Sequence, residues 1–162
     1  MAHVKWVTNI TVIAKPFIGP FQTVDYVYLA NEGDYQNAVP VTEIKVNSII
    51  TWPSKGEQVH LGQQNVRGLA WTGKGKVSKV EVSIDNGTTW KAAKLTSPEY
   101  EQYTWTFWEY PLNISAPGHY FILARAQDSN GNIQPKSASW NAKGYGNNSI
   151  HQVVINVPKI LH

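Results

Sequence analysis

Apolar and polar residues alternate with a period of two in short segments through most of the chain. Segments with this pattern lie at residues 43–53, 57–73, 76–95, 102–114, 118–131 and 151–158. Turn residues separate them, such as Asp85 and Gly87. This alternation predicts strands that each bury one face, and no stretch shows the apolar stripe of a helix. The pattern predicts an all-β fold, an immunoglobulin-like antiparallel β-sandwich of about seven strands.

The first 41 residues depart from this pattern. Residues 4–13 (VKWVTNITVI) alternate and are rich in β-branched residues, which predicts a strand. Residues 14–41 contain three prolines and follow neither a helical nor a strand period. A connection of this length without secondary structure is more typical of a linker or a binding segment than of a domain interior. We therefore predict a junction strand and interdomain arm over residues 1–41, and the sandwich over residues 42–162.

The composition excludes several kinds of chemistry. The 162 residues include no cysteine, which rules out disulfides, thiolate nucleophiles and cysteine-ligated zinc. No two of the five histidines have the spacing of metal ligands. The net charge of +3 is small, and the lysines between residues 74 and 94 are more typical of a solvated strand face than of a nucleic-acid site. No apolar run approaches the ~18 residues of a membrane span, so neither a nucleic acid nor a membrane is an expected partner.

Polar residues concentrate in the loop before the last predicted strand, where residues 140–151 read WNAKGYGNNSIH. Polar side chains on a glycine-rich loop beside a rigid strand often form a site. One interpretation is a complete small enzyme centred on Lys143, Asn147 and His151, although no paired acid and base accompany them. The other is a loop that serves only to hold a shape.

Aromatic residues are frequent, with seven tryptophans and eight tyrosines. Four tryptophans lie within or beside predicted strands, where a sandwich core takes large side chains: Trp71, Trp90, Trp105 and Trp140. Aromatic side chains occupy both faces of residues 102–114. A face with Trp105, Trp108 and Tyr110 would suit a stand-alone carbohydrate-binding module, whereas a core or a protein interface is the more common use of such residues.

Several segments together resemble one family. They are AWTGKGKVSKVEVSIDNGTTWKAAKL, YTWTFWEYPL, ARAQDSNGNIQP and WNAKGYGNNSIHQVVINV. In this order and at this spacing they resemble the C-terminal domain of the sulfite oxidase family of molybdenum enzymes, the molybdenum-cofactor oxidoreductase dimerisation domain. VKWVTNITV resembles the junction with the preceding catalytic domain, and DYVYLANEGDY resembles the segment that crosses between the domains. The resemblance covers nearly the whole chain.

The resemblance implies a non-catalytic domain that forms a homodimer. In the family, the upstream domain binds the molybdenum–molybdopterin cofactor and supplies the cysteine that ligates the metal. Because this chain has no cysteine, we expect a fragment of a larger oxidoreductase rather than a stand-alone relative. The implied partners are a second copy, the upstream molybdenum-cofactor domain, and a cytochrome or other electron acceptor for the parent. The sequence leaves the compartment unknown, and the exported bacterial relatives suggest a periplasmic parent.

The resemblance also gives the loop a role. In animal sulfite oxidases the arginine of a WNxRG motif reaches the substrate-anion pocket, and WNAKG places Lys143 at that position. Lysine keeps the charge but lacks the planar fork of arginine, so the implied substrate is sulfite or another small anion. In the isolated chain we expect Lys143 to project into solvent. The residues expected to support the loop are Trp140, Asn141, Gly144, Asn147, Asn148 and His151.

Overall fold

The computed structural model of the protein describes residues 5–97 and 102–159. These residues form two compact units. The smaller unit contains the residues up to 41 together with 141–145, and the larger unit contains residues 42–140 and those from 146 onward. No helix in the described part of the chain is long and apolar enough to cross a membrane.

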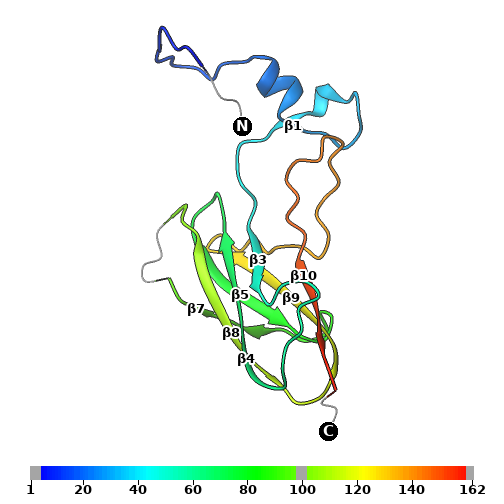
Figure 1. The fold of residues 1–162 in the computed structure, drawn as a ribbon. Coiled ribbons are helices and arrows are strands. Elements are labelled where there is room, and N and C mark those ends of the chain that lie inside the picture. The colour runs from blue at the N-terminus through cyan, green and yellow to red at the C-terminus, as the bar shows by residue number, and fades with distance from the viewer. Residues whose placement is uncertain (1–4, 98–101, 160–162) are drawn as a thin grey trace. The chain divides into compact units, whose positions relative to one another are not determined.

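The larger unit is a sandwich of two four-stranded antiparallel sheets (Figure 1). One sheet has the order β10 (His151–Val157), β9 (Gly118–Asp128), β5 (Val77–Ser83) and β6 (Lys91–Ala92). The other has the order β3 (Asn47–Trp52), β4 (Gly62–Trp71), β8 (Thr106–Ile114) and β7 (Lys94–Leu95). Every strand of this sandwich falls within a segment that alternation predicts. The all-β, immunoglobulin-like prediction is confirmed.

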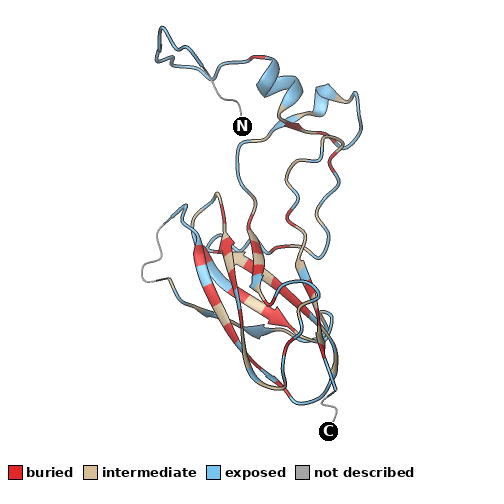
Figure 2. Cartoon of the chain, in the orientation of Figure 1, coloured by how far each residue is buried: buried red, intermediate tan, exposed pale blue. Residues whose placement is uncertain are grey.

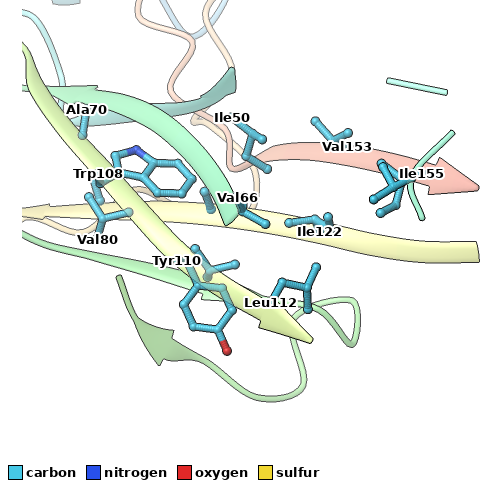
Figure 3. Close-up of a cluster of buried hydrophobic side chains, with 14 of the residues drawn as sticks. Ile50, Val66, Ala70, Val80, Trp108, Tyr110, Leu112, Ile122, Val153 and Ile155 are labelled. Carbon is cyan, nitrogen blue, oxygen red and sulfur yellow. The ribbon is translucent and has the colours of Figure 1, made fainter. Parts of the chain in front are cut away.

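The core lies between the two sheets, and both sheets contribute to it. Buried and exposed residues alternate along the strands (Figure 2), so each strand turns one face to the core. Apolar side chains from both sheets gather in one cluster (Figure 3) that includes Val66, Val80, Ile122 and Ile155. Trp108 of β8 is its largest fully buried side chain, at 1% exposure.

Trp108 requires a glycine on the neighbouring strand. Gly68 of β4 lies directly opposite Trp108 in the β4–β8 pair. A Cβ atom at Gly68 would meet the Trp108 ring at 2.1 Å and the carbonyl oxygen of Ile49 at 2.1 Å. The missing side chain therefore makes room for the indole ring, which is one of the uses of glycine inside a strand.

The prediction that four tryptophans serve the core is wrong, because none of the four belongs to the core cluster. Trp105 is 63% exposed and Trp140 is 80% exposed, whereas Trp71 and Trp90 are partly buried. The register of β4 and β8 explains the exposure of Trp105, because Leu69 pairs with Phe107 on the outer face of the sheet. Odd-numbered residues of β8 therefore point outward and even-numbered ones point inward, and a shift of one residue would exchange the faces.

The smaller unit contains short elements. They are the π-helix η1 (Phe21–Asp25), β1 (Val27–Tyr28), the 3₁₀ helix η2 (Tyr35–Asn37) and β2 (Val39–Pro40). The strands β1 and β2 pair in antiparallel fashion, with Val27 opposite Pro40.

The predicted strand over residues 4–13 is wrong where the structure describes it, and Val4 lies outside the described residues. Residues 5–13 contain no strand. Trp6 and Val12 are each 96% exposed. Alternation shows that a segment suits a sheet, but a strand forms only where a neighbour pairs with its backbone, and no described strand pairs with this segment.

Candidate functional site

Asn141 holds residues 141–145 of the polar loop within the smaller unit. Its side-chain oxygen accepts a hydrogen bond from the backbone N–H of Leu29 at 2.7 Å, and the N–H of Ala142 donates to the carbonyl of Leu29 at 2.8 Å. The Asn141 side chain also donates to the carbonyl of Tyr145 at 3.4 Å. Asn141 is buried, at 6% exposure. Both backbone groups of Leu29 are thus satisfied by the loop, which positions residues 141–145 on the chain that follows β1.

Lys143 lies on the N-terminal arm. Its ammonium group donates a hydrogen bond to the carbonyl of Val24 and lies 5.3 Å from the centroid of the Tyr35 ring, a distance at which a cation is attracted to an aromatic face. The expectation that Lys143 projects into solvent is therefore wrong. The arm supplies a carbonyl oxygen and an aromatic ring from residues distant in sequence, and local turn chemistry does not predict either contact.

Gly144 completes the turn that carries Lys143. Its N–H donates to the carbonyl of Asn141 at 2.9 Å, and its φ of 75° lies in the left-handed region that favours glycine. This local role agrees with the glycine-rich composition of the loop.

Asn147, Asn148 and His151 act within the larger unit. The Asn147 side chain accepts hydrogen bonds from the N–H and the hydroxyl of Ser149 at 3.1 and 3.0 Å. Asn148 is buried and donates to the carbonyl of Val46 at 3.2 Å. Nδ1 of His151 accepts from the N–H of Ile50 at 3.0 Å, which ties β10 of one sheet to β3 of the other. Each of the three side chains has a structural partner.

Trp140 is the exception among the proposed supporting residues. Its side chain is 80% exposed, so burial gives no support to its role as an anchor of the loop, and that role stays a prediction. The hydrogen bonds of Asn141 fix the start of the loop instead.

Sequence reasoning missed Gln134, which is buried at 1% exposure. Its side-chain oxygen accepts from the hydroxyl of Ser48 at 2.7 Å and from the N–H of Ala126 at 3.1 Å. Its amide nitrogen donates to the side chain of Asn47 at 2.7 Å and to the carbonyl of Ser149 at 2.9 Å. Gln134 thus joins β3, β9 and the segment before β10. It follows a turn and precedes a proline, where no periodicity distinguishes a buried amide from an exposed one.

The described residues contain no group of three or more His, Cys, Asp or Glu side chains that could hold a metal ion. Residues 38–158 match the family model of the Mo-co oxidoreductase dimerisation domain. This chain belongs to that family. The resemblance seen in the sequence segments is confirmed.

Relatives of this dimerisation domain include several oxidoreductases. Chicken (Gallus gallus) sulfite oxidase is 32% identical over 160 residues, which cover 92% of this chain and 35% of the relative. Human mitochondrial sulfite oxidase is 32% identical over 167 residues, covering 96% and 31%. Nitrate reductase (NADH) 1 of Phaseolus vulgaris is 36% identical over 146 residues, covering 81% and 17%. The chain thus spans about a third of the length of the sulfite oxidases it matches.

One solved structure of an oxidoreductase also resembles this chain in fold. The sulfane dehydrogenase SoxCD of Paracoccus pantotrophus matches with a TM-score of 0.71 and 26% sequence identity. The match covers 87% of this chain and 39% of the SoxCD chain.

The carbohydrate platform considered from the sequence is not formed by the dimerisation domain. Trp108 and Tyr110 are buried in the core at 1% and 9% exposure, whereas Trp105 is exposed. The three side chains do not share a surface, because residues 105 and 108 point to opposite faces of the sheet.

The His151 contact predicts a pH dependence of stability. Burial lowers the pKa of the His151 imidazole below its ordinary value of 6.5. The unfolded chain therefore takes up a proton as pH falls through 6.5, whereas the folded chain keeps His151 neutral until a lower pH. The free energy of unfolding should fall as pH falls through this window. Protonation of Nδ1 also removes the acceptor for Ile50.

His151→Asn tests this prediction, because asparagine keeps an acceptor oxygen near the position of Nδ1 and does not titrate. We expect urea unfolding of this variant to depend less on pH below neutrality than unfolding of the wild type. Equal pH dependence in the two proteins would contradict the assignment to His151.

Proposed function

We propose that this chain joins two copies of a molybdenum oxidoreductase of the sulfite oxidase type and performs no catalysis itself. The match of residues 38–158 to the dimerisation-domain model carries the proposal, because that range contains every strand of both sheets. Residues 1–41 would serve as the junction and interdomain arm, and residues 42–162 as the pairing domain. The test is the mass of the chain in solution.

The molybdenum–molybdopterin cofactor of the proposed parent does not fit on this chain. The chain has no cysteine to ligate molybdenum, and the residues that the structure describes form no other cluster of metal ligands. We therefore place the cofactor in the upstream catalytic domain. A cytochrome or another electron acceptor would take the electrons from the parent's reaction.

We infer that Lys143 contributes positive charge to the substrate-anion pocket of the intact enzyme. Its ammonium group has three N–H donors, and the described contacts use one of them on the carbonyl of Val24. The ring of Tyr35 and the turn at Gly144 restrict where the ammonium lies. An ammonium group that is held in place and has further N–H donors can bind a small oxyanion, with which it would interact as a point charge.

Lys143→Ala in the full-length, molybdenum-loaded enzyme is expected to raise the KM for sulfite about tenfold. This corresponds to about 1.4 kcal/mol, near the lower value for a hydrogen bond to a charged group. Lys143→Arg keeps the charge and should retain most of the affinity. Steady-state kinetics at fixed ionic strength make the measurement.

Lys136→Ala is the matched control, because Lys136 is an exposed lysine of the larger unit and its loss changes the net charge equally. Its KM should equal that of the wild type. A Lys143→Ala enzyme with wild-type KM and kcat would refute the pocket role.

A further inference from the structure

An apolar patch occupies the outer face of the sheet β3-β4-β8-β7. Ile49, Leu69 and Phe107 lie side by side across three strands, since Ile49 pairs with Leu69 and Leu69 pairs with Phe107. Trp71 and Trp105 lie two residues further along on the same face, and their rings stack with centroids 6.1 Å apart. We call these five residues the outer patch. All five lie within the range of the family match.

The outer patch is not part of the core. Its side chains point away from Trp108 and Ala70, which face the other sheet. Trp105 is 63% exposed and Phe107 is 56% exposed. Contiguous aromatic and aliphatic surface without charge is typical of the centre of a protein interface, and isolated domains rarely leave it in contact with water.

A hollow within this surface offers a place for a side chain of a partner. It has a volume of about 300 Å³, and Leu69, Phe107, Thr51 and Thr96 line it beside Gly68. Trp108 also borders the hollow. Aromatic side chains seated in such hollows commonly dominate binding energy at interfaces.

Both signs of charge border the outer patch. Arg67 of β4 lies opposite Glu109 of β8 in the strand register, and Lys94 of β7 lies 3.6 Å from the Glu109 carboxylate. A two-fold axis brings identical surfaces together, so a surface of one charge would repel its copy. A border with both signs lets the carboxylate of one copy face a cation of the other. This self-complementarity favours a second copy of this chain as the partner.

We propose that the outer patch is the surface through which two copies of this chain pair, with Arg67, Lys94 and Glu109 at its border. This proposal rests on the proposed function: the family match supplies the reason to expect pairing, and the outer patch supplies its place. The exposed aromatic side chains of one copy, Trp105 and Phe107, fill the hollow of the other copy.

Phe107→Glu and Phe121→Glu form a matched pair of variants that tests the proposal. Both residues are exposed phenylalanines on strands, at 56% and 42% exposure, but Phe121 lies on β9 of the other sheet. Light scattering coupled to size-exclusion chromatography would give the mass of each variant and of the wild type over the same concentrations, and circular dichroism would report folding. Trp105→Ser, a milder change in the outer patch, replaces Phe107→Glu in the test if the latter does not fold.

We expect the wild type and Phe121→Glu to be dimers. Phe107→Glu should be a folded monomer, with its dissociation constant raised about 30-fold or more, since a central aromatic contributes at least about 2 kcal/mol. A dimeric Phe107→Glu beside a monomeric Phe121→Glu would place the interface on the other sheet and overturn the proposal while leaving the proposed function intact. A monomeric wild type would overturn both. In that case, a response of tryptophan fluorescence to oligosaccharides that Trp105→Ser abolishes would assign the outer patch to sugar binding.

Discussion

Trp108→Ala should destabilise the sandwich by about 4 kcal/mol, the usual loss for an aromatic side chain removed from a core. Trp108 is 1% exposed and packs within the cluster that both sheets form. Backbone atoms of β3 and β4 border the space around the indole at Gly68, so the strands cannot collapse easily into the cavity. The free energy of unfolding from urea titrations, followed by circular dichroism, measures the loss.

Trp140→Ala is the control for this variant. It makes the same chemical change at a side chain that is 80% exposed, so its free energy of unfolding should stay within about 0.5 kcal/mol of the wild type. Trp108→Phe should lose less than Trp108→Ala, because the phenylalanine ring leaves a smaller cavity. The loss of Nε1 breaks no hydrogen bond, since this atom has no partner among the described residues. Equal destabilisation by the alanine variants at 108 and 140 would contradict the core described above.

Gln134→Leu should destabilise the protein by about 3 kcal/mol, although leucine has a similar size and is more apolar. The substitution leaves the hydroxyl of Ser48 and the N–H of Ala126 without their acceptor, and the carbonyl of Ser149 loses its donor. A buried polar group without a partner is destabilising by about 1–3 kcal/mol. Urea unfolding again gives the measurement.

The control for Gln134→Leu is Gln152→Leu. Gln152 is an exposed residue of β10, so the same substitution there should change the free energy of unfolding by less than about 0.5 kcal/mol. If Gln134→Leu were as stable as the wild type, the buried hydrogen bonds of Gln134 would contribute little, and apolar packing alone would join β3 to β9.

The fold could be predicted from the sequence because strand alternation and turn residues are local signals. The faces of β8 could not be assigned in this way, since both faces carry aromatic side chains. Only pairing with β4 shows that Trp108 points inward and Trp105 outward. The strand prediction for residues 5–13 failed for a related reason. Their alternation suits a strand, but no described strand pairs with them.

Only those features of the site that depend on neighbouring residues in the sequence could be predicted. The turn at Gly144 follows from its residue type. The contact of Asn141 with Leu29 spans 112 residues, and that of Lys143 with Val24 spans 119. No sequence period encodes contacts at such separations, so the arm's hold on Lys143 became evident only in the structure. Gln134 was missed for the same reason, since its partner Ser48 is 86 residues away.

The absolute mass of the wild-type chain in solution tests the central claim most directly. Light scattering coupled to size-exclusion chromatography, over a wide range of concentrations, separates a stable pair from transient association. The chain has a mass of 18.1 kDa, and we predict a species of twice that mass that persists on dilution. A species of 18.1 kDa at every concentration would contradict the claim that this chain pairs two copies of the enzyme.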